Sequence, residues 1–290
     1  MRNIAPKLAF SPAMLVVVTV YVGCILWTVL ISFTASKLLP AYEFIGFDNY
    51  VDIFRSSRWT TSLANLGLFA VAYIGGCLFV GYLLAICIDQ GVKGESVFRT
   101  AFLFPHSVSF IVTGLVWQWL LNPSLGLQQL ARDFGWATFA FDPLGSRQFA
   151  IFAVAIAAIW HGSGFVMALL LAGLRGIDGE IWKATAIDGI PKWRVYKDIV
   201  APMLLPMFMT CFVLLSVGAI KSYDVVVAMT GGGPGVATEV PAKFVLDFMF
   251  ERANIGRATA GATVMLMTVG IVAAPWLYYS RMRKARGAGK

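Results

Sequence analysis

Few residues in this chain of 290 could carry out covalent chemistry. Each of the four cysteines lies in an apolar stretch, and none belongs to a Cys-x-x-Cys pair: Cys24, Cys77, Cys87 and Cys211. This spacing supports neither a disulfide framework nor a zinc site, and it favours small apolar packing residues. The two histidines, His106 and His161, lie far apart in the sequence. We therefore predict no catalytic centre and no metal site.

Polar residues inside apolar stretches are the better candidates, because such groups usually face a cavity or each other. At about 1.5 Å per helical residue, His161 and Lys221 fall near the middle of a hydrocarbon core about 30 Å thick. Aromatic rings beside a few hydrogen-bonding groups suit a sugar. The candidate path comprises Trp160, His161 and Phe165 with Lys221, Ser222, Tyr223 and Asp224. Three alternatives remain: a Lys221–Asp224 ion pair, an interhelical hydrogen bond by His161, and plain aromatic packing.

These residues must be positioned by membrane helices. The chain is 59% hydrophobic and 13% charged, whereas soluble domains average about 45–50% and about 25%. The composition excludes an ordinary cytosolic enzyme, a disordered chain and a nucleic-acid binder. Six apolar stretches are long enough to span a bilayer: 12–34, 63–88, 100–121, 149–174, 203–229 and 258–280. We predict an all-α membrane protein with six transmembrane helices, and a kink or helix start at Pro105.

The chain has a net charge of +8, and the distribution of its lysines and arginines predicts how it is oriented in the membrane. With the N-terminus inside, 14 of the 23 lysines and arginines fall on the cytoplasmic side and 8 on the other, so both termini are predicted to be cytoplasmic. The first stretch exceeds a signal-peptide core and is expected to be retained. Residues 35–62, 122–148 and 230–257 then form external loops. Without a soluble domain or long linker, residues 1–290 are predicted to form a single domain.

The connection 175–202 has a pattern of its own. Ile181, Ala184 and Ile187 recur at helical spacing, and Gly189 supplies a helix stop. A second helix is expected from Pro191. A short helix, a glycine break and a second helix on the cytoplasmic face could dock into another protein. The alternative is a solvated loop.

This connection resembles the EAA loop of permease subunits in binding-protein-dependent ABC importers. The matching residues are Ala184, Asp188, Gly189, Ile199 and Pro202; Lys183 stands where the family has Glu, and Glu180, one turn earlier, is a possible substitute. The resemblance implies that the loop seats in a cleft of an ATPase subunit. Phe44–Tyr50, Phe104–Gly126 and Tyr223–Gly256 resemble the carbohydrate branch, most closely its glucose/mannose and α-glucoside permeases. Alignment with a maltose-type relative adds Gly162, Gly218 and Ala219 to the path, beside His161, Phe165 and Ser222.

The resemblance implies a type I ABC importer permease in the bacterial inner membrane, carrying a mono- or oligosaccharide. Implied partners are a second homologous permease, two ATP-binding subunits, a periplasmic sugar-binding protein and membrane lipid, but no nucleic acid. The chain has no G-x-x-x-x-G-K-[ST] motif, so it is expected to be no enzyme and to bind no cofactor, with ATP and Mg on the partner ATPases. One alternative is an importer of a polyol or glycerol phosphate with the same architecture. The other is a stand-alone secondary transporter.

Overall fold

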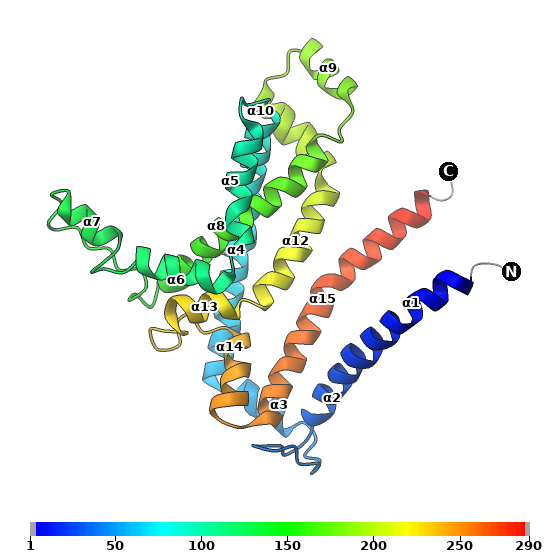
Figure 1. The fold of residues 1–290 in the computed structure, drawn as a ribbon, viewed down its shortest axis with the longest axis vertical. Helices are drawn as coiled ribbons and strands as arrows, with labels where there is room; N and C mark the ends of the chain where they lie inside the picture. The colour runs from blue at the N-terminus through cyan, green and yellow to red at the C-terminus, as the bar shows by residue number, and fades with distance from the viewer. Residues whose placement is uncertain (1–3, 288–290) are drawn as a thin grey trace. The chain divides into compact units, whose positions relative to one another are not determined.

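The computed structural model describes residues 4–287, with side chains for residues 10–274, and the chain is largely helical (Figure 1). Among the described residues, four helices are long and apolar enough to cross a membrane: Phe10–Ile31, Ser57–Asp89, Ala150–Leu174 and Ile255–Ala274. Two bent pairs raise the number to six if each pair is one span. The all-α membrane fold is confirmed. The cytoplasmic placement of both termini stays a prediction, and Arg2 and the last side chains lie outside the described residues.

Two of the six predicted spans, the third and the fifth, are bent pairs of helices in the described structure rather than single helices. The third consists of α5 (Glu95–Ser107) and α6 (Phe110–Leu120), bent by 98°. Pro105 lies inside α5, and the break follows it at Val108 and Ser109, so a helix start at Pro105 was wrong. The fifth is bent by 70° between Lys192–Met203 and Leu205–Ile220. It is interrupted again between α12 (Leu205–Ile220) and α13 (Tyr223–Thr230).

The described residues group into two compact units, and the prediction of a single domain stays a prediction. The first unit, Met1–Thr60 with Pro241–Thr268, contains one continuous helical span near the N-terminus. Its helices are α1 (Ile4–Val17), η1 (Val18–Val22), α2 (Gly23–Ile31), α3 (Asp48–Arg55), the start of α4 (Ser57–Asp89), α14 (Pro241–Leu246), η3 (Asp247–Glu251) and the first part of α15 (Ile255–Gly287). Residues 241–251, expected as external loop, are therefore helical.

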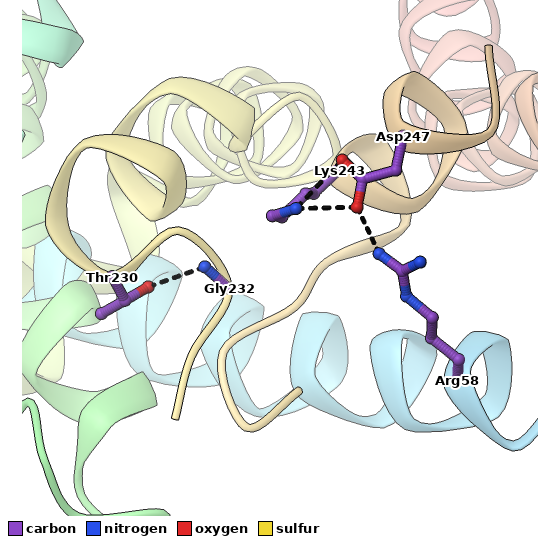
Figure 2. Close-up of polar contacts among 5 residues, drawn as sticks. All are labelled: Arg58, Thr230, Gly232, Lys243 and Asp247. Atoms are coloured by element: carbon purple, nitrogen blue, oxygen red, sulfur yellow. Dashed lines mark hydrogen bonds and ion pairs between the residues drawn. The ribbon is translucent and has the colours of Figure 1, made fainter. Parts of the chain in front are cut away.

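A half-buried ion group centred on the buried Asp247 links elements of the first unit (Figure 2). The guanidinium of Arg58 pairs with the Asp247 carboxylate, and Lys243 Nζ lies 2.7 and 3.0 Å from its two oxygens. Beside them the rings of Trp59 and Phe244 are 4.9 Å apart. Hydrogen bonds between charged groups are stronger than neutral ones. This group therefore fixes α14 and η3 against the start of α4.

The second unit, Thr61–Val240 with Val269–Lys290, contains every candidate path and coupling residue. Its central helix is α8 (Ala150–Leu174), whose small residues allow neighbouring helices to approach closely. At Gly164 an added Cβ would lie 1.8 Å from the carbonyl oxygen of Phe102 on α5. The remaining helices are α7 (Leu127–Asp133), α9 (Gly179–Ile187), α10 (Lys192–Arg194), η2 (Val195–Val200) and α11 (Ala201–Met203).

Candidate functional site

His161 lies on α8 opposite the break between α5 and α6. It is 4% exposed, and its Nε2 lies 3.0 Å from the carbonyl oxygen of Val108, the residue after α5. A carbonyl only accepts, so Nε2 carries the proton and donates. The other ring nitrogen, Nδ1, is then an acceptor, and it is buried with no partner among the described residues. A buried unpaired acceptor costs about 1–3 kcal/mol, so a ligand hydroxyl or a water is favoured at Nδ1.

Aromatic rings surround this imidazole on two sides. The Phe110 ring on α6 lies 4.0 Å from that of His161, and the His106 ring on α5 lies 5.0 Å from it. Phe165 stacks on His106 with centroids 4.9 Å apart. Trp160 instead contacts Trp117 at 6.2 Å. The structure therefore brings His161 and Phe165 into one group with His106 and Phe110, two residues that the path prediction missed.

Tyr73 on α4 links the two predicted path glycines. A Cβ added at Gly162 would lie 3.1 Å from the Tyr73 hydroxyl and 2.9 Å from Cys77 Sγ, and one added at Gly218 would lie 3.8 Å from the same hydroxyl. Glycine at 162 thus lets α4 approach α8 closely. Sequence reasoning missed Tyr73, because a tyrosine in an apolar stretch carries no distinctive signal. Ala219, beside Gly218 on α12, is buried.

The residues from Lys221 to Asp224 lie at the second break. Lys221 and Ser222 separate α12 from α13, and Asp224 lies in the first turn of α13. Lys221 and Asp224 are exposed, and the ion pairs found among the described side chains include neither. The i, i+3 ion pair that a continuous helix would allow between Lys221 and Asp224 does not form, because the helix is interrupted between these two residues. Ser222 is buried and its Oγ lacks a partner within the described part of the chain, while Tyr223 is half-buried.

The connection 175–202 folds as two helices around a glycine. The side chain of Asp178 accepts from the Glu180 amide at 3.0 Å and caps α9. Gly189 has φ +65°, the left-handed conformation that glycine adopts without strain. The exposed face of α9 carries Glu180, Lys183, Ala184 and Ile187, and Ile187 is 86% exposed. The exposed face of α9 therefore combines charged side chains with apolar ones.

The second part of this connection is attached to α4. The hydroxyl of Tyr82 donates to the carbonyl oxygen of Tyr196 at 2.7 Å, and the rings of Tyr196 and Trp182 lie 5.6 Å apart. Arg175 pairs with Glu95 at 2.6 Å. Ile199 is half-buried, while Asp188 and Pro202 are exposed. A movement of α9 therefore has direct contacts through which to reach α4.

The glycine-rich segment after Thr230 is a tight turn, as the sequence indicated. Gly231, Gly232 and Gly235 have φ values of +62°, +95° and +65°. The Gly232 amide donates to Thr230 Oγ1 at 3.2 Å (Figure 2). Asn65 on α4 donates to the carbonyl oxygens of Val236 and Glu239. The segment is thus an ordered surface at one end of the second unit.

Comparisons with known proteins identify the family. Residues 77–285 match the binding-protein-dependent transport system inner membrane components. The chain is 34% identical over 278 residues to a probable ABC transporter permease of Pyrococcus horikoshii, covering 93% of each. It is 32% identical over 256 residues to the xylose/arabinose import permease of Haloferax volcanii, covering 86% of this chain and 79% of that one. The chain therefore belongs to this family and is a multi-pass inner-membrane protein. These matches confirm the resemblance to carbohydrate ABC importer permeases.

The fold agrees with a solved permease. A bacterial ABC transporter that imports the acidic polysaccharide alginate contains a chain that superposes with a TM-score of 0.81 at 16% identity, covering 95% of both chains. At this identity the likeness shows the fold alone. The broken third and fifth spans therefore belong to an ABC importer permease fold.

Proposed function

We propose that this chain carries a sugar across the bacterial inner membrane as one permease subunit of an ABC importer. The observation that carries the proposal is α9, an exposed helix ended by a left-handed Gly189 and displaying Ile187, in a chain of this family. In the proposal, Glu180 to Pro202 seat in an ATPase subunit, with two such subunits per transporter. ATP and Mg bind there, and this chain performs no covalent step.

The proposed path runs past two polar groups in the second unit. His161, whose ring contacts those of Phe110 and His106, has an unpaired Nδ1 that can accept a hydrogen bond. Lys221, Ser222 and Asp224 offer further hydrogen-bonding groups. Sugars present hydroxyls and apolar C–H faces, which need this combination. A second homologous permease would complete the path, and a periplasmic binding protein would deliver the sugar to the external segments. The substrate class we propose is a glucose, mannose or α-glucoside type of sugar.

Transport would follow a shift between inward- and outward-open populations, driven because ATP binds one state more tightly. The test is sugar uptake and ATPase co-purification by wild type and Gly189→Pro, since proline cannot adopt φ +65°. We expect Gly189→Pro to lose uptake, whereas Gly179→Ala, where an added Cβ meets nothing within 4 Å, retains it. Uptake by Gly189→Pro, or a chain that never recruits an ATPase, contradicts the proposal.

A polyol or glycerol phosphate importer of the same architecture is the competing function. A phosphorylated substrate favours arginine in the path, and the predicted apolar stretches contain Lys221 but no arginine. Uptake assays of a deletion strain on single sugars, polyols and glycerol phosphate separate these cases. Uptake driven by an ion gradient without an ATPase would establish a secondary transporter instead.

A further inference from the structure

The segment after α6 exposes large apolar side chains although it is well folded. Leu127 and Leu130 on α7 and Phe134, the residue that follows the helix, are spaced by three and four positions, and Phe134 is 85% exposed. Leu125 and Trp136 on either side are 77% and 66% exposed. In Figure 1, α7 lies beyond the end of α6, away from α4, α5 and α8. An exposed apolar group of this size needs a partner other than water.

The opposite side of this segment is polar and internally bonded. Gln128 Oε1 accepts from the Phe141 amide at 2.6 Å, and Arg132 Nε donates to the Phe139 carbonyl oxygen at 3.1 Å. Gln129 Nε2 donates to Asp133 Oδ1 at 2.9 Å. The segment is therefore a folded amphipathic unit, with one polar face and one apolar face.

An apolar groove of about 590 Å³ connects this segment to the spanning helix α8. Its walls include Trp117 on α6 and Leu121 just after it, Leu127 on α7, Phe149 just before α8, and Phe152 and Ile156 on α8. Phe149, Phe152 and Ile156 are each between 44% and 61% exposed. The groove thus runs from the start of α8, a candidate membrane span, to the first turn of α7.

We propose that residues 125–141 lie in the headgroup region of the outer leaflet, and that the groove holds an acyl chain of a phospholipid from that leaflet. Amphipathic helices with one apolar face bind at this depth, and tryptophans concentrate at membrane interfaces. The groove is continuous with the exposed apolar side chains of Phe152 and Ile156 on α8, which is a candidate membrane span. Soluble partners, in contrast, bind surfaces about as apolar as the protein average. The choice of leaflet rests on the proposed topology.

Site-directed spin labelling of the assembled transporter in phospholipid nanodiscs tests the interfacial placement. The exposed native cysteines Cys24 and Cys87 are replaced by alanine, and one nitroxide is attached at Phe134→Cys or Trp136→Cys. Gln129→Cys and Asp133→Cys are matched controls on the polar face. At labels 134 and 136 we expect oxygen, which concentrates in the bilayer, to have greater access than a water-soluble nickel complex. At labels 129 and 133 we expect the nickel complex to have greater access than oxygen.

Equal access of the nickel complex to both faces would show that the segment lies in water and would overturn the proposal. Exclusion of both reagents from 134 and 136 would show a protein partner there, such as the second permease, and would also overturn it. Neither readout depends on transport. A failure here therefore leaves the proposed sugar transport intact, and a failed uptake assay leaves these accessibilities unchanged.

The groove is tested with a phospholipid that carries a photoreactive diazirine on its acyl chain. We expect labelling at Phe149 and Phe152 that falls when Ile156→Trp fills the groove, while labelling at Ile271, 72% exposed on α15, stays unchanged. Ala140→Trp, which fills the groove from its rim, serves as a second variant. Labelling of the groove that neither variant reduces would overturn the proposed acyl-chain site.

Discussion

The two breaks in the second unit differ in how their polar groups are paired. At the break between α5 and α6, the carbonyl of Val108 accepts a hydrogen bond from His161. At the break between α12 and α13, Lys221 and Asp224 are exposed and have no ion-pair partners in the described structure. The helices beside the first break are also packed closely, because Gly164 meets the Phe102 carbonyl, while a Cβ added at Gly218 near the second would meet only the Tyr73 hydroxyl, at 3.8 Å. One interruption is thus closed by the chain's own groups. The other leaves polar groups available to a ligand or to movement.

The largest expected effect on stability comes from disturbing the close packing of α5 on α8 beside the first break. Gly164→Ala would place a Cβ 1.8 Å from a backbone oxygen, so α5 and α8 must move apart. We expect a loss of assembled transporter or a large fall in Tm, measured by thermal unfolding in detergent. Gly218→Ala is the control, since its Cβ would meet only the Tyr73 hydroxyl at 3.8 Å. Equal Tm values for the two variants would contradict the difference in packing.

The next effect tests the hydrogen bond that closes the first break. His161→Phe keeps an aromatic ring but leaves the Val108 carbonyl unpaired, which should cost about 1–3 kcal/mol of stability. His106→Phe is the matched control, because His106 is exposed and contacts Phe165 through its ring. A Tm for His161→Phe as high as that of His106→Phe would show that the bond contributes little.

At the second break we expect a functional effect without a structural one. Lys221→Ala with Asp224→Ala should reduce sugar uptake and leave Tm near that of the wild type, because neither side chain has an ion-pair partner in the described part of the chain. A double-mutant cycle on Tm should give a coupling energy near zero. A coupling of about 0.5–1 kcal/mol would reveal an ion pair, and undiminished uptake would remove both residues from the path.

The smallest effect concerns Ser222, whose buried hydroxyl lacks a partner among the residues described. Ser222→Ala should leave Tm unchanged or slightly raised, because no hydrogen bond is lost, and should raise the KM for uptake. Ser216→Ala is the control, since its hydroxyl donates to the Phe212 carbonyl oxygen at 2.7 Å within α12. An unchanged KM for Ser222→Ala would place that hydroxyl outside the substrate path.

The two helices of the connection 175–202 were predicted well because their signals are local. Gly189 ends α9, Asp178 caps it and Pro191 precedes the second helix, and each effect involves residues only a few positions apart. The packing around the predicted path residues was indicated only in part. His106, Phe110 and Tyr73 join these residues through packing between helices, and an aromatic residue in an apolar stretch looks alike in sequence whether it meets lipid or a histidine.

By itself, the sequence determined the class of protein, the approximate positions of six spans and the shape of the connection 175–202. Hydropathy and turn preferences depend on residues that are close together in the chain, so both can be predicted from the sequence alone. Tertiary structure alone decided where spans break and which polar groups are paired. His161 and Val108 are 53 positions apart, and the close packing of α5 on α8 brings them together. Tertiary structure also decided that Lys221 and Asp224 do not pair, because the helix is interrupted between α12 and α13.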